Sequence, residues 1–198
     1  MKNMIVTFLM MSAACAAFAG EDVVNQIGRP MIFIDGRRQG IPLRDVKADT
    51  AIPVRLSETK DSFSAQKAFT GDDWQCFELT FTPEKSGRVT VVPHVDGVRR
   101  DKDGKLPYAW FYCDDITVEG AELKNGGFED SSDSFKPWGQ FGPGDVKSLL
   151  TEDAYGVHSG KRALKLFAGA PVGQGIQVTE NVPVTIRMWS RRPASAEE

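Results

Sequence analysis

The chain has 198 residues, including 19 Gly and 11 Pro, and a net charge of −3 at neutral pH. This length is sufficient for one β-domain of ordinary size, or two small ones, with a hydrophobic core. So small a net charge gives no electrostatic reason to expect a nucleic acid or an anionic membrane as a partner.

Residues 1–19 have the parts of an export signal. Lys2 supplies a positive start, residues 4–17 form an uncharged apolar run, and residues 17–19 (AFA) form a small-x-small cleavage pattern. The run is short for a membrane span and acidic residues follow it. We therefore expect a signal peptide over residues 1–19, a secreted or periplasmic protein, and no membrane association beyond that signal.

Two cysteines, Cys76 and Cys113, would remain after cleavage of this signal. An even number of cysteines in an oxidising compartment is compatible with a disulfide. Because a disulfide requires Cα atoms within about 7 Å, the two predicted strands that carry them would have to be neighbours in the right register. Two separate buried thiols are the alternative. No CxxC motif or Cys/His cluster predicts structural zinc.

The first part of the mature chain is weakly patterned. Residues 20–68 are predicted to hold a linker followed by degenerate strands. Within them, residues 31–37 (MIFIDGR) indicate a strand that ends in an Asp-Gly turn. Residues 52–56 indicate another strand, which Pro53 restricts to a sheet edge or a strand start.

The strand pattern becomes stronger after residue 69. Residues 74–82 alternate, with Phe77, Leu79 and Phe81 on one face, as in a half-buried strand. Further strands are predicted over residues 88–95, 106–118, 161–168, 175–182 and 184–190. Many short strands separated by Gly, Pro and Asp-Gly turns predict an all-β jelly-roll sandwich. Residues 193–198 are predicted to be a frayed tail.

Several motifs resemble a carbohydrate-binding module of the cellulose- and xylan-binding type, which has a galactose-binding-like jelly roll. Within residues 125–192 the motifs resemble its first half: residues 125–129 (NGGFE), Trp138, residues 158–165 (HSGKRALK), residues 175–178 (GIQV) and residues 185–191 (TIRMWSR). Within residues 69–124 they resemble its second half: residues 71–81 (GDDWQCFELTF), residues 87–91 (GRVTV) and residues 110–118 (WFYCDDITV).

The two halves occur in swapped order, since modules of this family begin with the NGGFE half. One interpretation is a tandem of modules, the first with a degenerate start and the second cut off. Another is one permuted sandwich completed by both halves, and a gene fragment is a third. We favour the composite sandwich, because a half-sandwich would expose an apolar face and unpaired strand edges. A short distance between Asp115 and Glu129 would support it.

The resemblance implies a structural calcium ion between the first and last strands of the module. Its ligands here would be Glu129 and Asp115, helped by backbone carbonyls of the loop around Ser159 and Lys161. Calcium takes six to eight hard oxygens at about 2.3–2.6 Å, which carboxylates and loop carbonyls can supply. The alternative is that Asp114 and Asp115 face solvent or bind the amides of turns.

The resemblance also implies a polysaccharide or oligosaccharide as ligand. Aromatic side chains would stack on the sugar rings and amide side chains would bind their hydroxyls. The candidates are Trp138, Tyr155 and Trp110, with Trp74 and Trp189 as further aromatics and Gln140, Gln177 and Gln174 as polar groups. Trp138 and Tyr155 are expected to be the most exposed because they flank loops. The alternative is a structural or adhesive sandwich whose tryptophans only pack the core.

No combination of residues predicts an active site, so we expect a protein that is not an enzyme. His158 and Ser159 are adjacent in a turn and do not form a nucleophile elbow. Paired acidic residues are too common to indicate glycosidase chemistry, which requires two carboxylates across a cleft. A further alternative is a fragment of a secreted glycoside hydrolase, since the resemblance implies modules that are attached to such enzymes, but this chain has no room for the catalytic domain.

Overall fold

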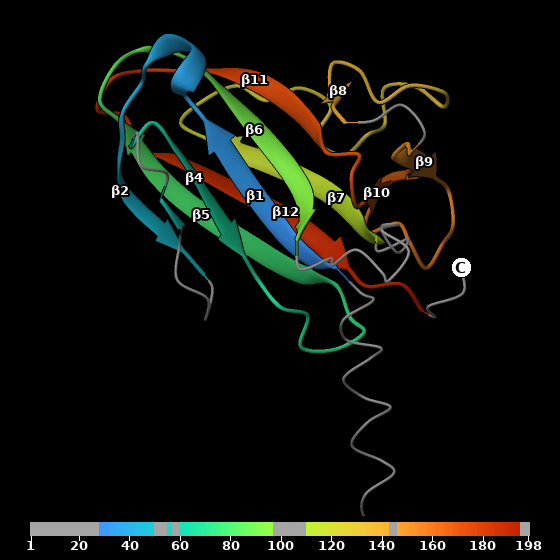
Figure 1. Ribbon diagram of the computed structural model, residues 1–198. Helices are drawn as coiled ribbons and strands as arrows, with labels where there is room; N and C mark the ends of the chain where they lie inside the picture. The colour runs from blue at the N-terminus through green and yellow to red at the C-terminus, as the bar shows by residue number, and fades with distance from the viewer. Residues whose placement is uncertain (1–27, 50–54, 57–59, 97–109, 143–145, 195–198) are drawn as a thin grey trace, which may run out of the picture.

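The computed structural model describes residues 28–49, 55–56, 60–96, 110–142 and 146–194. They form two antiparallel β-sheets packed as a sandwich (Figure 1). Sheet 1 has the order β3 (Arg55–Leu56), β4 (Ser62–Gln66), β1 (Arg29–Asp35), β6 (Gly87–Asp96), β11 (Val172–Val178), β8 (Gly139–Gln140). Sheet 2 has the order β2 (Leu43–Ala48), β5 (Gln75–Pro83), β12 (Val184–Arg191), β7 (Trp110–Glu119), β10 (Ala163–Phe167), β9 (Leu149–Thr151). The prediction of an all-β sandwich is confirmed.

The core lies between the two sheets. Phe77, Leu79 and Phe81 of β5 are fully buried, as their alternation predicts, and Phe63 of β4 meets Phe81 edge-on at 5.7 Å between ring centroids. Burying each such side chain stabilises the fold by about 1.5–3 kcal/mol relative to leaving it exposed. The only helical element among the described residues is a 3-10 turn, η1 (Arg37–Gln39), which follows the Asp35-Gly36 turn.

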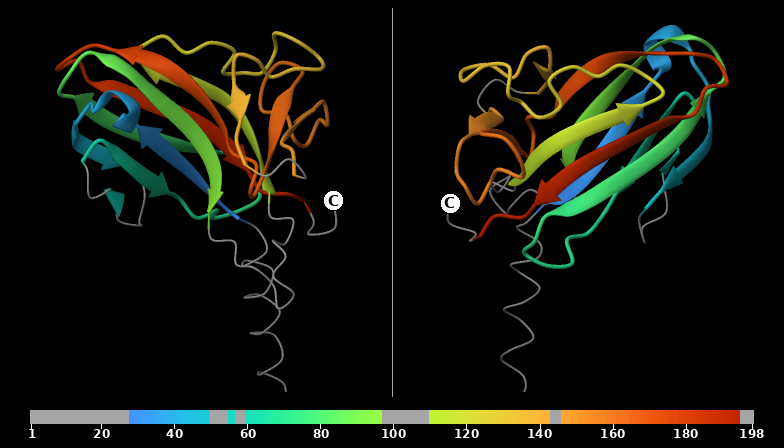
Figure 2. Two further views of the ribbon diagram at one scale, coloured as in Figure 1. Left: turned by 45° about the horizontal axis from the view of Figure 1, so that its top comes forward. Right: turned by 180° about the vertical axis from the view of Figure 1, so that it is seen from behind.

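Strands from both motif-bearing ranges are interleaved in the same sheets. β12 lies between β5 and β7, β10 pairs with the other edge of β7, and β11 pairs with β6. Figure 2, right, shows β12 in red between β5 in green and β7 in yellow-green. The described strands therefore close one sandwich, to which the weakly patterned region contributes β1, β2 and β4. This is the arrangement that the composite interpretation requires.

The two cysteines do not form a disulfide. Cys76 of β5 is half-buried on the outer face of sheet 2, and Cys113 of β7 is buried in the core. β12 separates their strands, and both thiols are free. The alternative of two separate thiols is thus confirmed, but only Cys113 is buried, as that alternative expected of both. Burial raises the pKa of both thiols, which lowers their reactivity at neutral pH.

Some predictions fall outside the described residues. These are the signal peptide over residues 1–19, Pro53 with most of its strand, residues 106–109 at the start of another strand, and the end of the tail. Where the structure does describe the chain, no helix is long and apolar enough to cross a membrane.

Candidate functional site

A β-bulge in β7 sets the position of two adjacent carboxylates. Arg187 of β12 pairs with Thr117, whereas Trp189 pairs with Asp114. Two residues of β7, Asp115 and Ile116, therefore lie opposite the single residue Met188 of β12. Asp115 has a φ of 45°, in the left-handed region. Bulges redirect side chains locally. Here Asp114 and Asp115 both contact the same loop, residues 157–162, called the His158 loop below.

Asp114 holds the backbone of the His158 loop. Its side chain is buried, with 0% of the residue exposed. Its Oδ2 accepts hydrogen bonds from the amides of His158 at 2.9 Å and Ser159 at 3.2 Å, and its Oδ1 accepts one from the amide of Asp115 at 2.7 Å. Burial disfavours the charged form and raises the pKa of Asp114 to about 6, although the three amides act in the opposite direction.

Asp115 and Glu129 bind the same loop from two further sides. Asp115 Oδ2 lies 2.7 Å from His158 Nδ1, and Asp115 Oδ1 accepts a hydrogen bond from Ser159 Oγ at 3.0 Å. Glu129 Oε1 accepts the amides of Lys161 and Arg162, both at 2.7 Å. Asp115 and Glu129 are therefore brought to one place, as the composite sandwich interpretation expects.

The NGGFE motif connects the bulge to this loop. Ile116 in the bulge donates its amide to the carbonyl of Gly126 at 2.9 Å, and a Cβ on Gly126 would overlap the carbonyl oxygen of Ile116. Gly127 lies between the two acids, because a Cβ there would be 3.3 Å from Asp115 Oδ1 and 3.9 Å from Glu129 Cγ. The motif thus places Glu129 beside the bulge, and position 126 must be glycine because any larger residue would overlap the backbone of Ile116.

Aromatic side chains gather above this loop on the outer face of sheet 2. The imidazole of His158 stacks on Trp189 of β12, with ring centroids 4.2 Å apart and planes at 17°. Trp74, just before β5, meets the same imidazole edge-on at 5.1 Å. Tyr155 lies under the guanidinium of Arg191, 3.6 Å from its ring centroid. Trp74, Tyr155, His158 and Trp189 are all half-buried and form what we call the aromatic cluster.

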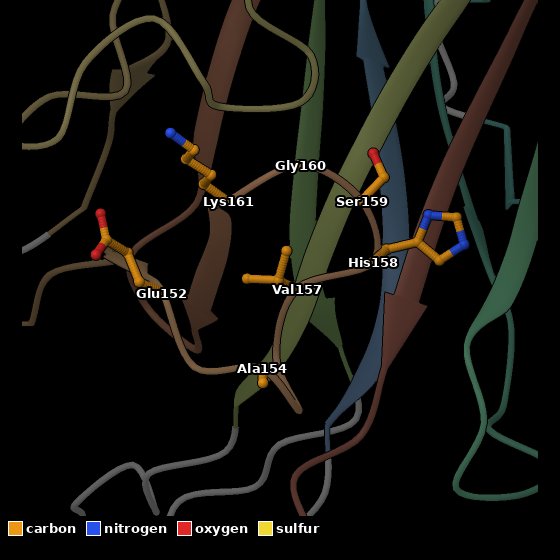
Figure 3. Close-up of a pocket in the computed structure, with 7 residues that line it drawn as sticks. All are labelled: Glu152, Ala154, Val157, His158, Ser159, Gly160 and Lys161. Atoms are coloured by element: carbon orange, nitrogen blue, oxygen red, sulfur yellow. The ribbon is translucent and has the colours of Figure 1, made fainter.

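A pocket of about 600 Å³ adjoins the aromatic cluster. Its lining belongs to one segment of the chain: Glu152, Ala154, Val157, His158, Ser159, Gly160 and Lys161. In Figure 3 the side chains of Glu152 and Lys161 lie on one side of this segment, and the ring of His158 points away on the other. The pocket and the aromatic cluster therefore share His158.

Two of the predicted sugar-binding aromatics are buried. Trp138 is 2% exposed, donates its Nε1 proton to the carbonyl of Asn125 at 2.9 Å and packs against Phe128. The prediction that Trp138 is exposed at a loop rim is wrong, because the indole closes the core behind the NGGFE turn. Trp110 is 3% exposed. Neither ring has a face available for a sugar in this structure.

The remaining predicted residues are divided between the two sheets. Tyr155 belongs to the aromatic cluster, and Trp189, one of the two further aromatics, lies half-buried on the outer face of β12. Gln140 binds the backbone of Val146 and Ser148, so its amide supports the fold at the edge of sheet 1. Gln177 is exposed on β11 of sheet 1, away from the aromatic cluster.

The predicted polar group Gln174 is also engaged within the protein, because its amide binds both backbone groups of Lys124. The sequence did not identify His158 as part of an aromatic surface. The only feature of the sequence that drew attention to His158 was its place at the start of the HSGKRALK motif. Asp114 binds the amides of the loop, as the alternative to calcium expects, but its full burial was not predicted.

The predicted calcium ligands meet, but the donor set does not fit the ion. The hydroxyl of Ser159 donates to Asp115 and the amide of Lys161 donates to Glu129, so hydrogen-bond donors face the carboxylates where calcium would require oxygen lone pairs. No group of three or more His, Cys, Asp or Glu in the described ranges is arranged to hold a metal. The carboxylates bind loop donors, as the alternative interpretation expects, and calcium binding itself stays a prediction.

No family model matches this chain, and comparisons with curated proteins and with solved structures give no significant match. The resemblance to carbohydrate-binding modules therefore depends on its motifs. The NGGFE, Asp-Asp and HSGKR motifs are far apart in sequence, yet they interlock around one loop beneath the aromatic cluster.

Proposed function

We propose that this sandwich is an exported, non-catalytic carbohydrate-binding protein whose ligand lies on the aromatic cluster. The observation that carries the proposal is the gathering of two half-buried tryptophans, Trp74 and Trp189, with Tyr155 on one face of sheet 2. Aromatic faces pack well against the C–H groups of pyranose rings, and sites for small ligands combine such faces with a few polar groups.

Polar groups suited to sugar hydroxyls lie next to the aromatic cluster. Along β12 the outward side chain after Trp189 is Arg187, which pairs with Glu78 of β5 and Glu119 of β7. Beyond it, the hydroxyls of Thr80 and Thr185 lie 2.9 Å apart. This face thus offers donors and acceptors in a row beside the rings, which supports a glycan ligand over a purely apolar one.

A structural or adhesive sandwich without a sugar site is the second candidate. It is favoured by the partners that the cluster finds within the protein: His158 on Trp189, and Arg191 on Tyr155. Aromatic rings that already pack against side chains of the same protein can stabilise the fold without any ligand. The two candidates differ in one measurable property, which is binding to a glycan.

The test is a glycan array, followed by affinity gel electrophoresis of the mature protein in polysaccharide gels. We expect retention on at least one glycan, and a loss of about two- to tenfold in affinity for W74A and W189A, since each stacked ring contributes about 0.5–1.5 kcal/mol. F141A is the matched control, because Phe141 is an aromatic residue 46% exposed beside β8 of sheet 1. Retention unchanged in W74A and W189A, or absent in the wild type, would overturn the proposal.

A further inference from the structure

We infer that His158 is a gate over the sugar-binding face of Trp189, which a bound glycan displaces. This inference rests on the proposed function and concerns how that site is opened. The imidazole occupies the space between the two indoles of the aromatic cluster, stacked on Trp189 and met edge-on by Trp74. In this arrangement the protein supplies its own planar ring where a ligand ring would stack.

The stacking distance leaves no room for a sugar. The centroids of His158 and Trp189 are 4.2 Å apart and the ring planes differ by 17°, which is van der Waals contact over the ring face. A pyranose would need a similar separation from the indole. The imidazole and a sugar therefore compete for the same face of Trp189, and removal of the imidazole would leave a slot beside Trp74.

The backbone of the His158 loop is held by hydrogen bonds that do not involve the imidazole. Buried Asp114 accepts the amides of His158 and Ser159, and Glu129 accepts those of Lys161 and Arg162. The Nδ1 atom of the imidazole hydrogen-bonds Asp115 Oδ2 at 2.7 Å, and the side chain of His158 remains 26% exposed. A side chain on a fixed backbone can turn about its own torsions without unfolding the loop.

The adjoining pocket gives the ring somewhere to go. His158 lines that pocket, and the lining includes the polar side chains of Glu152, Ser159 and Lys161. Its volume of about 600 Å³ greatly exceeds that of an imidazole. A ring that leaves Trp189 can thus exchange its stacking contact for polar surroundings on the other side of the loop (Figure 3).

The test compares H158A with the wild type, using cellohexaose and xylohexaose as probes in isothermal titration calorimetry. The wild type must break the ring stack and one hydrogen bond before it binds. We therefore expect H158A to bind about tenfold more tightly. F141A is the control, because it removes an exposed aromatic side chain beside β8 of sheet 1 and keeps the imidazole. Its affinity should equal that of the wild type.

A second measurement uses the wild type alone. Indole ring currents should shift the imidazole proton signals of His158 in the NMR spectrum, and a saturating probe should return them toward the values of an unstacked histidine. Weaker binding by H158A, or His158 signals that stay shifted while a probe is bound, would overturn the gate and leave the proposed function standing. If neither wild type nor H158A binds either probe or any arrayed glycan, both proposals fail.

Discussion

Asp114 should make the protein more stable in mild acid than at neutral pH. Its pKa of about 6 in the fold compares with an ordinary value of 3.8, so the folded protein binds this proton more tightly than the unfolded chain does. The stabilisation is fully present below the ordinary pKa and is lost as the pH rises through 6. The shift spans about two pH units at about 1.4 kcal/mol each, so the effect amounts to about 3 kcal/mol.

The assay is urea unfolding at several pH values between 4 and 7, for the wild type and D114N. Other carboxylates also titrate in this range or below it, so the quantity to compare is the difference in free energy of unfolding between the two proteins. In D114N that side chain no longer ionises. We expect the difference to change by about 3 kcal/mol in favour of the wild type as the pH falls from 7 to 4.

D73N is the control for this experiment, because Asp73 is exposed in the turn before β5. Its difference from the wild type should stay nearly constant across the same pH range. A difference for D114N that is equally flat would refute the reasoning. It would mean that the amides of His158, Ser159 and Asp115 fully offset the cost of burying the charge.

Three further outcomes are expected. W138A should lower the free energy of unfolding by about 3–5 kcal/mol in chemical denaturation, because it leaves a cavity in the core. Any glycan affinity of the folded protein should stay unchanged. Reduced affinity would mean that Trp138 belongs to the binding site after all. G126A should destabilise the fold more than G71A, since an added Cβ would overlap Ile116 at Gly126 and would meet no atom at Gly71. Equal melting temperatures of the two variants would contradict the conclusion that the NGGFE motif requires glycine at position 126. Millimolar calcium should leave the melting temperature of the wild type unchanged, because donors of the His158 loop already bind Asp115 and Glu129. A rise in melting temperature would show that the native state binds the ion.

The sequence predicted correctly those strands in which apolar and polar residues alternate, because one face of such a strand is buried and the other is not. β5 is the clearest case, because Phe77, Leu79 and Phe81 mark its core face in the sequence itself. β2 and β4 were not predicted as strands. They are short and mostly polar, and β4 is held by its pairing with β1. That kind of stabilisation depends on neighbours that are distant in sequence.

The candidate site was predicted only in part, for the same reason. The proximity of Asp115 and Glu129 followed from the two motifs and is found in the structure. Trp138 was misplaced because the sequence does not show that the carbonyl of Asn125 binds its indole. The stacking of His158 on Trp189 depends on where one loop crosses β12, which no local pattern determines.

The position of β12 has a consequence for synthesis of the protein. Of the described strands this one is made last, but it lies inside sheet 2, where Thr185 meets Thr80 across 105 residues of sequence. Until the ribosome has released it, β5 and β7 lack their shared neighbour, and each presents an open edge to other nascent chains. Contacts of such long range also slow folding. A chaperone that holds the growing chain would therefore be needed most between the synthesis of β7 and that of β12.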